Sequence, residues 1–247
     1  MIVTNKHNHP AWFHEKCKKL VFKPSWSATK IFNPAKMFWL EMRHWDTLET
    51  DCDDMLERLI GTGFDQLILD DPAKCQKYVS AIIGGHKVSG MMDMYDNGEI
   101  TDAKTCKAWK IKNKMFDDWR DQLLSYAVLC VENNMPAVKG KIFAGIKDGT
   151  KEKKSFGKVN TKYFPTKFYN GFSIDFTPEM IAEHKVKIEK QVSLLESTGL
   201  LPDDLLPACT DDERWARSND AFFRCHEWCN AKAVCKQYQE GVKDGNV

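Results

Sequence analysis

One dipeptide near the middle of the chain, Asn97-Gly98, constrains the local fold more than any other sequence feature. Asn-Gly between two strand-like runs is the strongest short-range signal for a hairpin with a two-residue type I′ turn. Such a turn fixes the pairing outward from itself, so that Asp93 faces Asp102. Directly opposed side chains have Cβ atoms about 4.5–5.5 Å apart. The sequence therefore predicts two carboxylates held side by side within a hairpin.

Opposed carboxylates repel each other, and a divalent cation between them removes that repulsion. Strand alternation places Lys104 on the same face as Asp102. Two acids and a lysine at one place suit phosphodiester hydrolysis. In that reaction a hard cation such as Mg²⁺ activates water, and a lysine offsets the charge that develops on phosphate. The alternative is a solvated hairpin face whose acids meet lysines by chance, which is common for so short a pattern.

Hydrophobic spacing and capping signals predict further elements around this hairpin. A helix is expected to start within 25–32, with a break at Asn33-Pro34. Further helices are expected at 51–69, at 115–132 and from Pro178 to Ser197, where Thr177 supplies the cap. Strands are expected at 137–146 and 172–176, and residues 1–24 are expected to be irregular. The predicted fold class is α/β, with a mixed central sheet flanked by helices.

Composition narrows the class of protein. Lysine and arginine total 36 and aspartate and glutamate 35, so the net charge of +1 excludes a protein that coats nucleic acid by bulk charge. The hydrophobic fraction of 43% argues against disorder. The sequence has no apolar run near the roughly 20 residues of a membrane helix and no signal-peptide pattern at its start, so we expect a cytoplasmic protein without a membrane partner.

Cysteines are unusually dense near the C-terminus. Nine cysteines form an odd set, which does not suit a disulfide framework in a reducing compartment. Four thiolates can bind Zn²⁺ or an iron–sulfur cluster, but the spacing here fits neither the paired C-x2-C zinc pattern nor the ferredoxin pattern. The alternative is a set of buried free cysteines. The candidate ligands are Cys209, Cys225, Cys229 and Cys235.

Taken in order along the chain, several residues resemble the core motifs of the PD-(D/E)XK nucleases. The pattern G-x-x-D, a turn and D-x-K is followed on the next predicted helix by a pair similar to the Q-x3-Y motif of the RecB-type branch. The matching residues are Gly90, Asp93, Asp102, Lys104, Gln122 and Tyr126. This resemblance implies a restriction-endonuclease-like core. It also implies a DNA nuclease and favours an exonuclease over an endonuclease.

The resemblance also implies a role for each of these residues. Asp93 and Asp102 would hold Mg²⁺ or Mn²⁺ together with the carbonyl of Ala103, and Lys104 would position the attacking water. The family usually places a histidine ligand on the preceding helix, where this chain has Asp65 in LIGTGFDQLILD. Aspartate also coordinates these metals through oxygen. Asp65 is therefore either a further ligand or a surface acid.

The cysteine-rich tail resembles that of iron–sulfur members of the same branch, among them AddB-like, CRISPR-associated and phage-encoded exonucleases. This resemblance implies a [4Fe-4S] cluster that holds a C-terminal helical tail against the nuclease core. Zn²⁺ is the alternative metal. The family's N-terminal Cys-Pro is replaced here by Asn33-Pro34, so Cys209 is expected as the fourth ligand and Cys52 is its competitor. The expected organisation is a segment at 1–24, a nuclease core at 25–199 and a metal-cluster tail at 200–247.

Lysines alternate with aromatic residues over 147–169, a composition that can bind phosphates and stack on unpaired bases; the alternative is a solvated loop with a few core aromatic residues. The resemblance implies DNA ends or single strands as the partner. The sequence carries no Walker A motif, so any motor would be a separate helicase or recombination partner. The resemblance implies a phage replication or recombination role in the cytosol of a bacterium or infected host, and allows a homo-oligomer. The alternative is an inactive DNA-binding or partner-binding module that retains the nuclease fold.

Overall fold

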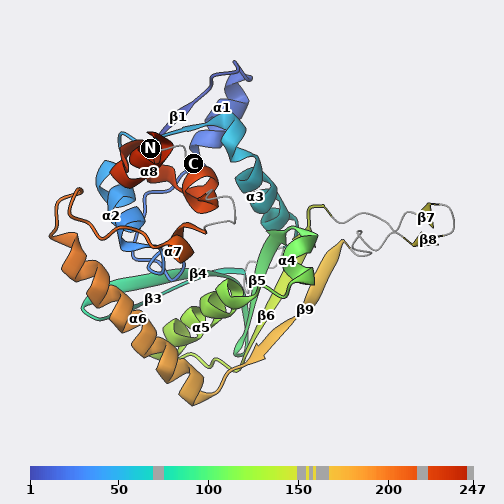
Figure 1. Cartoon of the computed structure of the whole chain (residues 1–247). Helices are drawn as coiled ribbons and strands as arrows, with labels where there is room; N and C mark the ends of the chain where they lie inside the picture. The colour runs from blue at the N-terminus through green and yellow to red at the C-terminus, as the bar shows by residue number, and fades with distance from the viewer. Residues whose placement is uncertain (69–74, 149–153, 156–157, 160–166, 216–221, 244–247) are drawn as a thin grey trace. The chain divides into compact units, whose positions relative to one another are not determined.

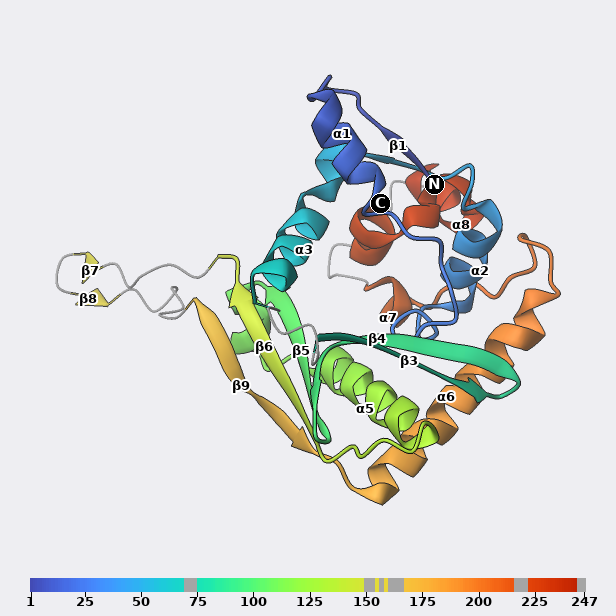
Figure 2. The same cartoon turned by 180° about the vertical axis from the view of Figure 1, so that it is seen from behind.

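Figure 1 and Figure 2 show a computed structural model of the chain from two sides. The structure describes residues 1–68, 75–148, 154–155, 158–159, 167–215 and 222–243. The chain divides into two compact units, one formed by Met1–Glu57 with Glu189–Val247 and the other by Arg58–Ile188. Each unit has buried residues of its own, such as Phe38 and Leu206 in the first and Ile100 and Leu129 in the second.

The unit at 58–188 is built on a five-stranded mixed sheet with the strand order β3-β4-β5-β6-β9. β5 and β6 run parallel, and the other neighbours run antiparallel. Buried and part-exposed residues alternate strictly along β6, because successive side chains point to opposite faces. The strands of this sheet are β3 (Cys75–Ile83), β4 (His86–Asp96), β5 (Glu99–Cys106), β6 (Lys139–Ile146) and β9 (Phe168–Asp175). Between β6 and β9 in the sequence, β7 (Lys154–Ser155) and β8 (Lys158–Val159) form a separate antiparallel pair.

The predicted hairpin turn is confirmed. Both residues of Asn97-Gly98 have positive φ, 46° and 92°, as a type I′ turn requires. The register runs outward from the turn as predicted as far as Met94 opposite Thr101. The described ladder between β4 and β5 ends there, so the predicted ladder pairing of Asp93 with Asp102 is wrong. A side-chain contact replaces it, and this opening between the two strands forms the candidate site.

Helix α5 (Asp117–Glu132) lies across one face of the sheet, as Figure 1 and Figure 2 both show. Every residue from Leu123 to Cys130 is buried, because α6 (Pro178–Gly199) packs on the other side of α5. The buried hydroxyl of Ser125 lies 2.9 Å from Nε2 of His184 on α6. The helices predicted at 115–132 and from Pro178 are confirmed, including the cap at Thr177. Two further helices are α3 (Leu56–Ile68) and α4 (Ala108–Lys112).

The other unit joins the two ends of the chain. Its N-terminal part contains β1 (Ile2–Thr4), α1 (Ala11–Lys18), α2 (Ala35–His44), β2 (Glu49–Asp51) and the 3-10 helix η1 (Cys52–Met55). Its C-terminal part contains α7 (Asp211–Arg214), the π-helix η2 (Arg224–Trp228), the 3-10 helix η3 (Asn230–Val234) and α8 (Lys236–Lys243). A small apolar core joins the two parts through Leu40, Leu206, Ala231 and Cys235.

Two predictions for the N-terminal region are wrong. Residues 1–24 were expected to be irregular, but they contain β1 and α1, and β1 pairs in parallel with β2 more than forty residues later. The helix expected within 25–32 is instead a series of turns, and the helix begins at Ala35. Pro34 explains the shift, because it disfavours helical backbone at the residue before it and is well suited to a helix start.

The sheet and its helices confirm the predicted α/β class, with a mixed central sheet flanked by helices and a C-terminal helical region that carries cysteines. This arrangement is consistent with a restriction-endonuclease-like fold. The described helices include none that is both long enough and apolar enough to span a membrane.

Candidate active site

The site begins where β4 and β5 separate. Oδ2 of Asp93 accepts a hydrogen bond of 2.8 Å from the backbone N–H of Ala103, so the side chain takes the place of a strand carbonyl. The N–H and C=O of one strand residue point to the same side. The carbonyl of Ala103 therefore also faces the opening between the strands, on the side of Asp93. The sequence pattern could not show this, because it assumed regular pairing up to Asp102.

Asp102 is the most enclosed acid of the site, with only 1% of the residue exposed. Its Oδ1 accepts a hydrogen bond of 3.0 Å from Nε2 of Gln122, and its Oδ2 lies 2.6 Å from Nζ of Lys104. Among the described residues, that second oxygen accepts no hydrogen bond of ordinary geometry. A buried carboxylate oxygen that is not fully satisfied costs stability unless a cation completes its surroundings. The donor set therefore fits a hard divalent metal.

Helix α5 supplies the residues that hold Asp102 in place. Gln122 and Tyr126 lie one turn apart, and Nε2 of Gln122 also donates to the hydroxyl of Tyr126 at 2.8 Å. The ring of Tyr126 packs directly on β4 at Gly90. A Cβ at that position would lie 2.7 Å from Cε1 of the ring, closer than real contacts allow. The glycine of the G-x-x-D pattern is therefore required by the helix that supports the carboxylate.

Burial and mutual repulsion raise the pKa values of two acids of the site, Asp93 and Asp65. Burial, followed by the charge of Asp102, raises the pKa of Asp93 to about 7. Burial also raises the pKa of Asp65 on α3, whose charge interacts with Lys104 and Asp102. Burial lowers the pKa of Lys104, but the three carboxylates outweigh that effect and raise it. Three acids thus face one lysine, an excess of negative charge that a bound cation would neutralise.

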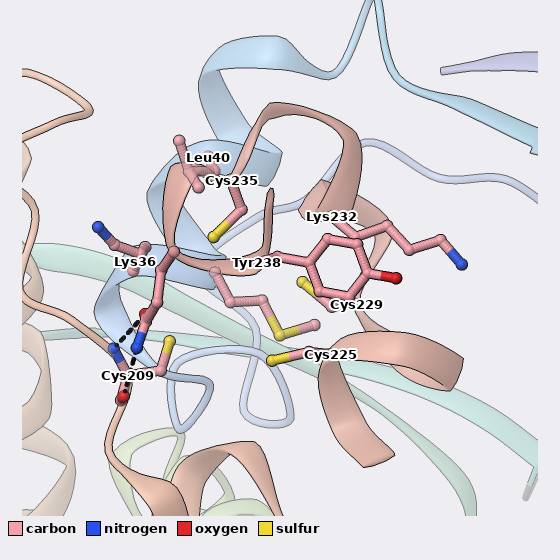
Figure 3. A pocket seen from close by; sticks show the side chains of 10 residues that line it. Lys36, Leu40, Cys209, Cys225, Cys229, Lys232, Cys235 and Tyr238 are labelled. Atoms are coloured by element: carbon pink, nitrogen blue, oxygen red, sulfur yellow. Dashed lines mark hydrogen bonds between the residues drawn. The ribbon is translucent and has the colours of Figure 1, made fainter. Parts of the chain in front are cut away.

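The structure also brings the four candidate cysteines together. Figure 3 shows their sulfur atoms directed toward one another around a small cavity of about 20 Å³, which Met37 and Leu40 also line. The backbone of Cys209 is held by two hydrogen bonds of 2.9 Å with the side-chain amide of Gln237. Cys52 is absent from this cavity and instead interacts with Cys17. The four cysteines are Cys209, Cys225, Cys229 and Cys235.

A second group of possible metal ligands lies near the N-terminus. Single ligand atoms of His7, Asp51 and Asp53 lie within 4.8 Å of one another. Asp51 already accepts hydrogen bonds from Thr4, from the backbone of Lys6 and from the backbone of Asp53. These bonds hold the pKa of Asp51 low, at about 2. The group is thus explained by a local network that ties β1 to the start of η1.

The lysine-rich stretch 147–169 is only partly described. Of the predicted DNA-binding lysines, Lys151, Lys153 and Lys162 lie outside the described residues. Lys154 and Lys158 are described by their strands alone, at the starts of β7 and β8. Burial lowers the pKa of Lys147, which follows β6.

Comparisons with known proteins place few limits on this chain. No profile of a known family matches it, and no curated protein sequence matches it. Among solved structures, one that is similar is a candidate exonuclease from Eubacterium rectale, with 16% sequence identity and a TM-score of 0.37. The match covers 67% of this chain and 59% of that one, so this chain spans less than two thirds of the other protein.

Proposed function

We propose that this protein is a Mg²⁺- or Mn²⁺-dependent deoxyribonuclease of the RecB-type PD-(D/E)XK branch. The observation that carries the proposal is the buried Oδ2 of Asp102, which lies beside Lys104 without a hydrogen bond of ordinary geometry. Asp93 and the carbonyl of Ala103 face the same opening between β4 and β5. Asp65 contributes a further acid from α3. These are oxygen ligands, the kind that Mg²⁺ and Mn²⁺ prefer.

A bound divalent cation would supply an activated water and would offset charge on the scissile phosphate. The chain's own residues do the rest. Nζ of Lys104 lies beside the carboxylate of Asp102, where it can orient the attacking water and offset charge on a phosphate oxygen. Gln122 fixes Asp102 by its hydrogen bond, and Tyr126 fixes Gln122. Tyr126 is 4% exposed, and burial raises its pKa, so its hydroxyl stays protonated.

The four cysteines are proposed to hold a structural [4Fe-4S] cluster. The four thiols line one cavity, and four thiolates are a donor set common to iron–sulfur and zinc sites. The resemblance of the cysteine-rich tail to iron–sulfur members of the RecB-type branch favours the cluster. Zinc remains the alternative.

The preferred substrate is a DNA end or single strand, cut by an exonuclease, in the cytosol of a bacterium or of a phage-infected host. A helicase or recombination partner would supply any motor, since the chain has no Walker A motif. A homo-oligomer is compatible with this role. The second candidate function is an inactive DNA-binding or partner-binding module. It is favoured by Asp65, which replaces the family's histidine and whose pKa is raised by burial.

A cleavage assay separates these functions. Purified protein is incubated with end-labelled linear single-stranded DNA, linear duplex and closed circular DNA, in Mg²⁺, Mn²⁺ or EDTA. The proposal expects loss of linear DNA with either metal, none in EDTA, and at least a hundredfold loss in Asp102→Asn and Lys104→Ala. Lys185→Ala, which removes a surface ion pair with Glu132, is the matched control and should cleave normally.

The other outcomes each select a different function. Equal cleavage of circles would make the enzyme an endonuclease. A folded protein that binds DNA but cleaves none with any metal would establish the inactive module. For the cysteines, the protein is purified without oxygen and analysed for iron, sulfide, zinc and visible absorbance. Stoichiometric zinc in a colourless protein would refute the iron–sulfur proposal.

A further inference from the structure

Three phenylalanine rings from three different elements lie in nearly parallel planes. Phe143 of β6 lies 5.8 Å from Phe64 of α3 and 5.6 Å from Phe168 of β9, with interplanar angles of 13° and 9°. Phe64 and Phe168 are 6.4 Å apart at 19°. Because all three distances are similar, the ring centroids lie at the corners of a triangle, and each ring stacks in parallel with the other two. We call these three rings the phenylalanine patch.

Packing explains two of these rings but not the third. Phe64 lies against the backbone of β6, where a Cβ on Gly145 would come within 3.1 Å of its ring. Phe64 and Phe143 are half-buried, as expected of residues that pack α3 on the sheet. Phe168 is 57% exposed, so much of its surface remains open to solvent at the side of the patch. An exposed aromatic ring that extends an ordered stack is suited to a ligand that is itself flat.

The patch is attached to the same short segments as the carboxylates. Phe64 directly precedes Asp65 on α3. Phe143 is the register partner of Ala103, the residue between Asp102 and Lys104. Adjacent strands are about 4.8 Å apart, so the patch starts one strand away from the D-x-K backbone, with Phe143 on the sheet face opposite to Asp102.

We propose that the phenylalanine patch is a stacking subsite for an unpaired nucleobase, and that it makes this enzyme prefer single-stranded DNA. The inference rests on the proposed nuclease function. Phenylalanine offers no hydrogen-bond donor or acceptor, so the patch would accept any base. In a duplex each base is covered by its neighbours, whereas an unpaired base has a free π-face that an aromatic side chain can stack on. The subsite would therefore select strand state without selecting sequence.

Binding measured in EDTA tests the subsite apart from cleavage. The probes are a fluorescent 20-nucleotide oligothymidine and a blunt duplex of equal length, followed by fluorescence anisotropy. Phe168→Ala should weaken binding of the single strand about 5- to 100-fold, the range for loss of one base–aromatic stack, and leave duplex binding unchanged. Phe168→Tyr should retain binding, and Phe168→Leu should lose it. Phe22→Ala, at another exposed phenylalanine (76%), is the matched control.

A second measurement identifies the base as the partner. A 2-aminopurine in the oligonucleotide should lose fluorescence when it stacks on the wild-type protein and keep it with Phe168→Ala. Equal weakening for single strand and duplex, or no weakening, would overturn the subsite. If wild-type protein cleaves linear DNA but fails this binding test, the inference fails and the nuclease function stands. If it passes the binding test but cleaves nothing, the nuclease function fails and the subsite belongs to a DNA-binding module.

Discussion

Asp93→Asn should make the metal-free protein more stable at alkaline pH while removing its response to metal. Asparagine has the shape of aspartate, and its Oδ1 can still accept the 2.8 Å hydrogen bond from the N–H of Ala103. The substitution therefore removes charge and keeps packing. In the native protein that charge lies buried near Asp102 and Asp65, with Lys104 as the cation of the site. Without a metal, this excess of carboxylates opposes folding.

The size of the effect follows from the pKa of Asp93. Burial, followed by repulsion from Asp102, raises this pKa from 3.8 to about 7. One unit corresponds to 1.36 kcal/mol, so the charged form destabilises the folded protein by at most about 4 kcal/mol. A raised acid pKa means that the folded state binds the proton more tightly. The penalty is therefore absent below pH 4, grows between pH 4 and 7, and is complete above pH 7.

Urea unfolding in EDTA at pH 5 and pH 8 measures this difference. Asp93→Asn should raise the free energy of unfolding by about 2–4 kcal/mol at pH 8 and by much less at pH 5. Mn²⁺ should stabilise the wild type and leave the variant unchanged, because the variant has lost a proposed metal ligand. Asp175→Asn, at a surface ion pair with Lys139, is the control and should shift stability by less than about 1 kcal/mol. A variant that gains equally at both pH values, or that gains nothing at pH 8, would refute the electrostatic argument.

Three further changes test other parts of the structure. Gly90→Ala should cost about 1–3 kcal/mol of unfolding free energy and reduce cleavage by displacing the Tyr126 ring, whereas Gly63→Ala, whose Cβ would meet nothing within 4 Å, should be tolerated. Burial lowers the pKa of His184 to about 4, despite Asp121 nearby, so acid must charge a buried imidazole; between pH 7 and 5 the free energy of unfolding of His184→Gln should therefore change in favour of folding by about 2 kcal/mol relative to the wild type, measured by urea unfolding. Cys229→Ser should lose the metal proposed at the four cysteines, as measured by elemental analysis, whereas Cys75→Ser, outside the cavity, should retain it.

The sequence predicted those parts of the site that depend on local rules. A two-residue turn at Asn97-Gly98 fixes the register of its flanking strands. The type of turn was therefore enough to predict that Asp93 and Asp102 lie close together. Helical spacing correctly placed Gln122 and Tyr126 on one face of α5. The predicted register was wrong only where a side chain replaced a backbone partner. Oδ2 of Asp93 accepts from Ala103, a contact between strands that no local pattern encodes.

What the sequence could not predict depends on contacts between distant segments. The strand β3 was missed, although Gly84-Gly85, both with positive φ, marks its turn into β4. The phenylalanine patch joins residues up to about a hundred positions apart, so Phe64 and Phe143 carried no recognisable pattern. Gly90 matched a family motif, but the motif alone offered no physical reason for a glycine there. The structure supplies that reason, because the Tyr126 ring packs directly against Gly90. A glycine on one strand, a tyrosine on a helix and a carboxylate on the next strand thus act as one unit. A mutation at Gly90 should therefore disturb Asp102, a proposed metal ligand, through Tyr126 and Gln122.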